Sequence, residues 1–306
     1  MRDVLEIREE GRATLAAGKP IVALESTVIA HGLPHPHNIE TARAMEAAAR
    51  ESGAVPATIG ILDGKIIVGL TREEILRLAE AKDVVKVSRA DLAAVVARKR
   101  TGATTVAATM VIAAMAGIRT FATGGIGGVH RGGENSMDVS ADLTELGRTQ
   151  VAVVCAGAKA ILDLPRTLEV LETLGVPVVG FGTQEFPAFY CCKSGLKLLH
   201  SVSTSSEAAQ IMTAQWTMPS AQTGGIVFVN PPPAQSGLTK EEMEKLISMA
   251  IAEATMQGVR GKEATPFLLR EVARLSQGKT LKANIDLLIS NARLAGQISV
   301  AYSAMN

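Results

Sequence analysis

Short apolar segments recur along the chain and alternate with stretches in which apolar residues repeat at helical spacing. Several short segments are apolar at successive positions, which is typical of strands covered by helices on both faces of a sheet. We therefore expect an α/β fold, a three-layer α/β/α sandwich with a largely parallel central sheet and a helical C-terminal region. The predicted strands are residues 21–24, 58–62, 84–87, 120–122, 151–155, 176–180 and 226–229.

Two regions depart from this alternation. Asp63-Gly64 separates two apolar runs and predicts a two-residue hairpin, and with it an antiparallel edge of the sheet. After the prolines at 231–233 no strand is predicted, and the pattern indicates helices over 239–257, 265–277 and 281–304. No repeat, low-complexity tract or long linker divides the chain, so residues 1–306 are predicted to form a single α/β domain.

The composition of the chain limits the kinds of partner that we expect the protein to bind. The chain has 31 Lys and Arg against 30 Asp and Glu and is 3% aromatic, so neither a basic field nor stacking faces favour nucleic acid. The uncharged stretch 101–118 is diluted by Thr and Gly and slightly short for a membrane span, which predicts a buried helix instead. The N-terminus lacks the apolar core of a secretory signal, and the three cysteines lack metal or redox spacing. We expect a cytoplasmic protein with reduced thiols.

Glu25 ends the first predicted strand and precedes a loop rich in Gly, Pro and His. The carboxyl ends of strands are where α/β proteins place their active sites. Burial there would raise the pKa of the carboxyl and suit it to donate a proton. The alternative is a carboxylate that caps the next helix.

Lys159 follows the predicted strand 151–155 and is surrounded in sequence by Ala and Gly. Partial desolvation would lower the pKa of its amine and leave it able to attack a carbonyl carbon, which makes Lys159 a Schiff-base candidate. The alternative is a lysine on the first turn of a helix whose charge reaches solvent.

A glycine-rich loop, residues 124–133, follows the strand at 120–122 and contains His130 and Arg131. Its backbone amides could approach an anion closely, although it matches neither the dinucleotide fingerprint nor the P-loop. A structural turn is the alternative. Lys86, at the end of another strand, could bind phosphate as a point charge or lie on the polar face of an edge strand.

Asp138 and Asp142 are four residues apart, a spacing that suits hard oxygen ligands for Mg²⁺ or Mn²⁺. Equally, Ser140 could cap a helix that has Asp142 in its first turn. The segment with His31, His35 and His37 offers no acidic or cysteine partner, so we expect structural histidines there. The amides of Asn230 and Asn284 could hold sugar hydroxyls or cap turns.

Taken together, five segments resemble the pseudouridine-5′-phosphate glycosidases, also described as indigoidine synthase A-like proteins. The resemblance runs in order from Glu25 to Asn284. The segments are ALESTVIAHG (23–32), FATGGIGGVHRG (121–132), DVSAD (138–142), VCAGAK (154–159) and KAN (282–284).

The resemblance implies reversible, lyase-type cleavage of the C–C glycosidic bond of pseudouridine 5′-phosphate to uracil and ribose 5-phosphate, in nucleotide catabolism. It implies Lys159 as the Schiff-base nucleophile, Glu25 as the proton donor and Asp138 as the ligand of one divalent metal, Mn²⁺ or alternatively Mg²⁺. It also implies a homotrimer. The substrate-binding positions that it implies are Lys86, Val106, His130, Ser140, Ala141, Asp142 and Asn284.

The chemistry explains why a lysine is needed. A C–C bond to uracil C5 cannot be broken by protonating a leaving oxygen as in ordinary glycosides, so an electron sink such as a Schiff base at C1′ is required. Two other functions stay open from the residues alone. One is a metal-independent, class I aldolase-like lyase acting on a sugar phosphate, and the other is a non-catalytic sensor of nucleotides or sugar phosphates.

Overall fold

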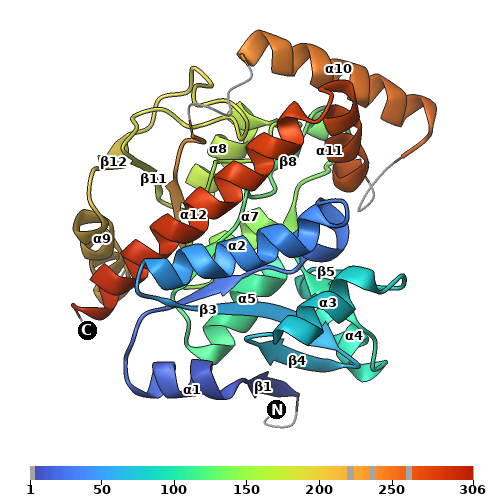
Figure 1. The fold of residues 1–306 in the computed structure, drawn as a ribbon. Coiled ribbons are helices and arrows are strands. Elements are labelled where there is room, and N and C mark those ends of the chain that lie inside the picture. The colour runs from blue at the N-terminus through green and yellow to red at the C-terminus, as the bar shows by residue number, and fades with distance from the viewer. Residues whose placement is uncertain (1–3, 219–223, 234–238, 260–263, 306) are drawn as a thin grey trace.

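The computed structural model describes residues 4–218, 224–233, 239–259 and 264–305. An 11-stranded, mostly parallel sheet runs in the order β1-β4-β3-β2-β7-β9-β13-β11-β12, with β6 pairing with β3 and β5 with β6 (Figure 1). Its strands are β1 (Leu5–Ile7), β2 (Ile21–Leu24), β3 (Val55–Leu62), β4 (Lys65–Val68), β5 (Val85–Val87), β6 (Gly102–Thr104), β7 (Thr120–Ala122), β9 (Ala152–Cys155), β11 (Val178–Phe181), β12 (His200–Val202) and β13 (Ile226–Val229). A separate antiparallel pair joins β8 (Val129–His130) to β10 (Leu162–Asp163).

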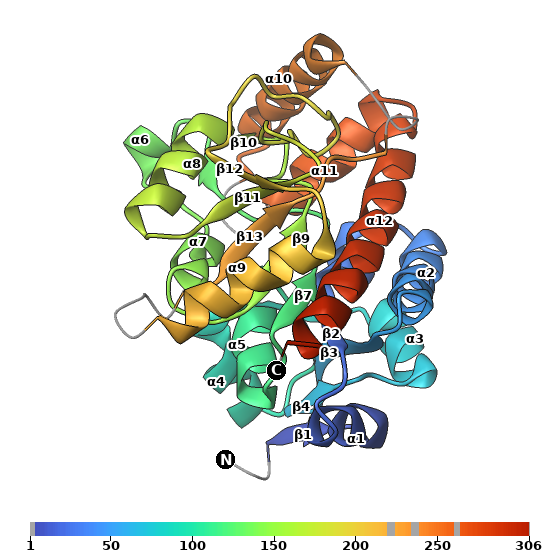
Figure 2. The ribbon, with the colours of Figure 1, turned by 90° about the vertical axis from the view of Figure 1, so that its left-hand side faces the viewer.

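Helices cover both faces of this sheet. Figure 2 shows α5, α7 and α8 on one side, and α2 and α12 on the other. The predicted three-layer α/β/α arrangement is confirmed. The helices are α1 (Glu9–Ala16), α2 (His37–Glu51), α3 (Arg72–Glu80), α4 (Leu92–Ala97), α5 (Val106–Ala116), α6 (Gly133–Ser136), α7 (Ala141–Leu146), α8 (Leu164–Thr173), α9 (Ser205–Thr217), α10 (Lys240–Met256), α11 (Ala264–Leu275) and α12 (Lys279–Ser303), with short turns η1 (Val28–Gly32) and η2 (Arg89–Asp91).

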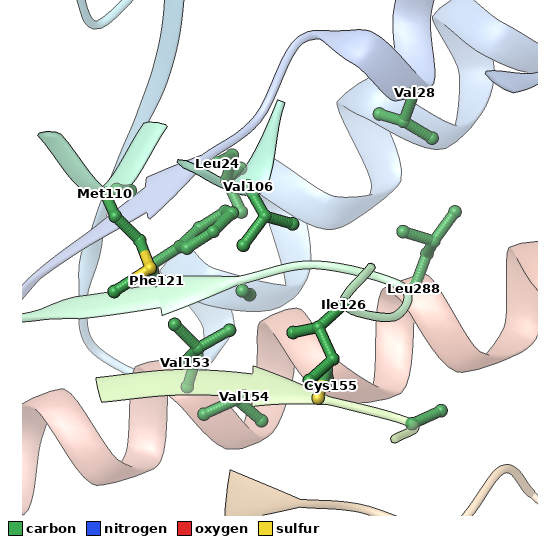
Figure 3. Close-up of a cluster of buried hydrophobic side chains, with 14 of the residues drawn as sticks. Leu24, Val28, Val106, Met110, Phe121, Ile126, Val153, Val154, Cys155 and Leu288 are labelled. Atoms are coloured by element: carbon green, nitrogen blue, oxygen red, sulfur yellow. The ribbon is translucent and has the colours of Figure 1, made fainter. Parts of the chain in front are cut away.

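The core lies between these layers. Every residue of β2, β9 and β13 is buried, as expected for apolar runs covered on both faces. Figure 3 shows Phe121 and Val153 from neighbouring strands packed with Val106 and Met110 of α5. Burial of this kind contributes about 25 cal/mol per Å² of apolar surface removed from water, which makes it the main stabilising term.

The stretch 101–118 is mostly buried, as predicted, although Met115 is exposed, and it is not one helix. Residues Gly102–Thr104 form β6, and the helix begins only at Val106, after Thr105 caps it by accepting from the amide of Ala108. A side-chain carbon at Gly102 would lie 2.4 Å from Cγ2 of Val87, so this close strand pairing depends on the glycine. Within the described residues, no helix combines the length and apolarity that a membrane span needs.

The Asp63-Gly64 hairpin is confirmed, with β3 and β4 antiparallel. It is not the edge of the sheet, because β1 pairs in parallel with the far side of β4. The strands at 5–7, 102–104 and 200–202 were not predicted, since each has only three residues and little apolar pattern.

The helical C-terminal region is also confirmed. Its last helix, α12, is 25 residues long and lies across the sheet beside α2. Near its end, the hydroxyl of Ser299 accepts from the amide of Ile21 and donates to the carbonyl of Ile21, both at 3.1 Å. The helix is therefore fixed to the beginning of β2.

The hairpin turn gives a test of the fold. Gly64 has φ +81°, and an added side-chain carbon would lie 2.6 Å from the carbonyl oxygen of Val96. We expect Gly64→Ala to lower the free energy of unfolding by more than about 1 kcal/mol. The substitution strains the backbone at a positive φ, and the added carbon also forces the neighbouring backbone to move. Gly18→Ala is the matched control, since Gly18 has φ +62° and no atom within 4 Å of the added carbon. Equal losses for the two variants in urea unfolding would contradict the steric argument.

Candidate active site

A pocket of about 370 Å³ opens where the carboxyl ends of the central strands meet the N-termini of α5 and α7. All ten residues predicted to form the site line this pocket. They are Glu25, Lys86, Val106, His130, Asp138, Ser140, Ala141, Asp142, Lys159 and Asn284.

Glu25 is buried at the end of β2 and does not cap a helix. The following turn, η1, begins at Val28, and its N-cap position is Thr27, with no side-chain cap, while the hydroxyl of Thr123 donates to the Glu25 carboxylate. Burial raises the pKa of Glu25 above its ordinary value, opposed chiefly by the positive charge of Lys159 and by the Thr123 hydrogen bond. The structure thus holds a carboxyl that keeps its proton to higher pH than an exposed glutamate does.

Lys159 lies between β9 and β10, before α8 begins, so it is not on the first turn of a helix as one interpretation had it. Its amide donates to the carbonyl of Ile126 at 3.1 Å, and its carbonyl accepts from Leu162 at 3.0 Å. These bonds fix the backbone at both sides of the residue. The half-buried side chain lines the pocket, close enough to Glu25 for their charges to interact.

Asp142 holds two parts of the pocket wall together. One carboxylate oxygen accepts from the amide of Ala107 at 2.9 Å, and the other accepts from the amide of Gly127 at 2.8 Å. Ser140 caps α7 by accepting from the amide of Asp142 at 3.3 Å, so the capping interpretation of this motif is confirmed. Because both oxygens of Asp142 accept amide protons, this carboxylate is poorly suited to hold a metal.

The glycine-rich loop is fixed by close packing. A side-chain carbon would lie 2.1 Å from Oγ of Ser140 at Gly127, and 2.7 Å from the Phe189 ring at Gly125. The amide of Gly127 donates to Asp142, that of Ile126 to Gly157, and that of Val129 to Thr167. These three amides therefore do not form the anion-binding surface that the glycine content had indicated.

Charge inside the pocket comes from side chains. His130, on β8, donates its amide to the carbonyl of Asp138 at 3.0 Å. Burial lowers the pKa of His130 below its ordinary value, with Asp138 opposing the shift and Lys159 and Lys86 adding to it. A neutral imidazole in this place can both donate and accept a hydrogen bond.

The fit of a divalent metal depends on Asp138. Within the described residues, no group of three or more His, Cys, Asp and Glu side chains is placed to hold a metal ion. Asp138 is half-buried at the pocket wall and offers one hard oxygen donor, which suits an Mg²⁺- or Mn²⁺-type ion that keeps most of its waters. The three histidines do not share one site. His31 lines the pocket, His35 is exposed, and Nδ1 of His37 lies 3.3 Å from Oε2 of Glu40.

Several pocket residues were not found from the sequence. Thr123 bonds Glu25, and its position directly after a predicted strand was the available signal. Pro266 and Leu269 of α11 close the pocket from a helix far along the chain and carry no chemical signal. Asn230 is not a sugar ligand, because its amide donates to Ser290 and Asn291 inside the protein.

Comparisons with known proteins agree along almost the whole length. The sequence profile of the family described as indigoidine synthase A-like protein matches residues 10–301. The chain is 53% identical over 305 residues to the pseudouridine-5′-phosphate glycosidase of Caldanaerobacter subterraneus subsp. tengcongensis, covering 100% of this chain and 99% of the relative. It is 52% identical over 305 residues to the pseudouridine-5′-phosphate glycosidase of Staphylococcus aureus, again covering 100% of this chain and 99% of the relative.

Two solved structures are similar. The prealnumycin C-glycosynthase AlnA, in complex with ribulose 5-phosphate, superposes with a TM-score of 0.90 at 41% identity, covering 99% of this chain and 98% of that chain. An indigoidine synthase A-like protein from Thermotoga maritima gives a TM-score of 0.89 at 39% identity, covering 98% and 97%.

Substitution at Asp142 tests its structural role. In Asp142→Asn, one of the two backbone amides faces an NH₂ group and loses its acceptor, which costs about 1–3 kcal/mol. Urea unfolding measures the loss. Asp138→Asn is the control, and we expect it to change the free energy of unfolding by less than about 0.5 kcal/mol. A neutral effect at Asp142 would show that its two amide bonds are not needed.

Proposed function

Because the chain belongs to the indigoidine synthase A-like family, we propose that it is a pseudouridine-5′-phosphate glycosidase that cleaves its substrate reversibly to uracil and ribose 5-phosphate. The observation that carries the proposal is the pairing of Glu25 and Lys159 in one pocket. A buried carboxyl with a raised pKa lies there beside an amine, in a chain that relatives bearing this name match over its whole length. An acid and an amine nucleophile are the two groups that cleavage of this C–C bond needs.

In the proposed reaction, the amine of Lys159 adds to C1′ of the sugar as the C1′–O4′ bond opens. The O4′ oxygen takes up the proton that the amine gives away. The C1′–C5 bond then breaks, its electron pair stays on uracil C5, and that carbon takes a proton from Glu25 while the lysine nitrogen completes a Schiff base to C1′. Water hydrolyses the Schiff base, returns the amine and releases ribose 5-phosphate.

For the phosphate end of the substrate, we propose the wall formed by Lys86, the first residue of α5, Val106, and residues 140–142. The ammonium group of Lys86 attracts phosphate, and the N-terminus of the 11-residue helix α5, whose first residue lines the pocket, turns its positive dipole end toward it. Binding of ribulose 5-phosphate by AlnA supports a sugar-phosphate site in this fold. We assign Asn284 to the base, since an amide can donate to and accept from uracil.

We also propose a bound divalent cation, Mn²⁺ or alternatively Mg²⁺, held through Asp138. Such an ion, when bound, orients substrate oxygens and stabilises negative charge. His130 lies beside Asp138 and would hold substrate as a neutral hydrogen-bonding group.

The homotrimer and the cytoplasmic location implied by the family resemblance stay proposals of the same kind. None of the three cysteines, all within the described residues, forms a disulfide, which fits a reducing compartment.

The first test is turnover. With pseudouridine 5′-phosphate and Mn²⁺ we expect release of free uracil, and borohydride should trap a pentose-phosphate adduct on Lys159, identified by peptide mass analysis. Lys159→Arg keeps the charge but cannot form the adduct, so kcat should fall by at least about 10³-fold. Glu25→Gln should lose about 10²- to 10⁴-fold in kcat, yet borohydride should still trap the adduct when ribose 5-phosphate is supplied, because that Schiff base forms without breaking the C–C bond. Ligand binding without uracil or adduct would instead support the sensor.

Metal removal separates the proposal from an aldolase-like lyase. After dialysis against EDTA we expect kcat/KM to fall at least about tenfold and to recover with Mn²⁺. Asp138→Asn should raise the Mn²⁺ concentration needed for half-maximal rate. Full activity in EDTA, with sugar-phosphate cleavage by Lys159, would favour the metal-independent lyase.

A further inference from the structure

Thr123 connects Glu25 to the sheet. It is buried directly after β7, its amide donates to the carbonyl of Val154 at 3.0 Å, and its hydroxyl donates to the carboxylate of Glu25. The position of the Glu25 carboxyl in the pocket therefore depends on where the backbone of Thr123 lies. Whatever fixes the end of β7 also fixes this hydrogen bond.

Asn291, on α12, bonds to the backbone of Thr123 and of the residue that follows it. It is fully buried, and its side-chain NH₂ donates to the carbonyl of Thr123 at 2.8 Å and to the carbonyl of Gly124 at 3.4 Å. The residue lies two helical turns after Asn284, so both side chains project from the same face of α12. Asn284 lines the pocket, and Asn291 bonds to the backbone at the end of β7.

Asn230 sets the orientation of the Asn291 amide. At the end of β13, its side-chain NH₂ donates to Oδ1 of Asn291 and to Oγ of Ser290, both at 3.0 Å. Its backbone amide donates to the carbonyl of Cys155 at 2.8 Å. Because the oxygen of Asn291 accepts from Asn230, its NH₂ group must face the carbonyls at the end of β7.

We propose that Asn291 is a positioning residue, which acts through Thr123 to hold the carboxyl of Glu25 at its place in the pocket. Its importance for turnover rests on the proposed function. The amide of Asn291 connects three elements, α12, β7 and β13, and it donates to the buried carbonyls of Thr123 and Gly124, the second of which also accepts from the amide of Ala156 at 2.9 Å. A misplacement of about 1 Å at such a group costs up to about 10²-fold in rate.

The effect on Glu25 has a defined sign. A hydrogen bond from Thr123 favours the charged carboxylate, so weakening that bond raises the pKa of Glu25 further. The other groups that act on this carboxyl are Lys159 after β9, Asp142 on α7 and Lys86 on β5. The bonds of Asn291 and Asn230 run to Thr123, Gly124, Ser290 and Cys155, so we expect the contributions of these charged groups to stay the same when Asn291 is changed.

The test compares Asn291→Leu with Ser299→Ala. Both remove buried polar contacts between α12 and strand backbone, but Ser299 lies about 12 Å further along the helix and contacts the beginning of β2. Both variants should lose thermal stability. Only Asn291→Leu should lower kcat on pseudouridine 5′-phosphate, by about ten- to a hundredfold, with KM changed less than about threefold.

A second readout needs no substrate. Titration of carboxyl-¹³C-labelled glutamate, with the Glu25 signal assigned by Glu25→Gln, should show a midpoint at higher pH in Asn291→Leu than in the unchanged protein and in Ser299→Ala. If Asn291→Leu does not fold, Asn230→Ala should give a smaller shift of the same sign, since Asn291 then loses only its orienting donor.

An unchanged Glu25 midpoint, with kcat equal to that of Ser299→Ala, would overturn the inference and leave Asn291 a purely structural residue. Absence of uracil release by the unchanged protein would instead refute the proposed function. The titration midpoints would still decide whether Asn291 positions Glu25.

Discussion

The site depends on how closely the backbone can pack where β7 and β9 end. The loop after β7 passes against Ser140 and against the ring of Phe189 at distances that exclude any side-chain carbon at Gly127 and Gly125. Only with hydrogen at these positions can the carboxylate of Asp142 reach the amides of both Gly127 and Ala107. This close packing joins the first turns of α5 and α7 to the strand ends.

Once that frame exists, the chemistry follows from burial. Glu25 and Lys159 follow strands on either side of β7, and both line the same pocket. Burial favours the protonated carboxyl, while the neighbouring lysine favours the carboxylate. The net result is an acid that keeps its proton to higher pH and lies beside an amine. Burial also lowers the pKa of His130, a shift that Asp138 opposes and the two lysines increase.

The far wall of the pocket comes from the C-terminal helices. α12 carries Asn284 at the pocket, Asn291 at the end of β7 and Ser299 at the beginning of β2, so one helix is joined to the sheet by polar contacts at several points along its length. Buried amides of this kind are costly when unpaired. The bonds of Asn291 and Ser299 to strand backbone fix where the helix lies, and Pro266 and Leu269 of α11 line the pocket beside it.

The sequence by itself determined the layers, most of the strands and all the pocket residues that carry charge. Apolar periodicity reports burial directly, Glu25 and Lys159 lie in short motifs next to strand ends, and Asp138 lies in one of the motifs that carry the family resemblance. It could not determine that 102–104 pairs as a strand, that β1 extends the sheet beyond the hairpin, or that the loop amides bond inward, because each depends on partners far along the chain. Tertiary structure alone decided the roles of Thr123, Asn230 and Asn291. A neutral polar side chain has no chemistry that reveals its partner, and only the packing of α12 on the strand ends shows which buried groups these side chains bind.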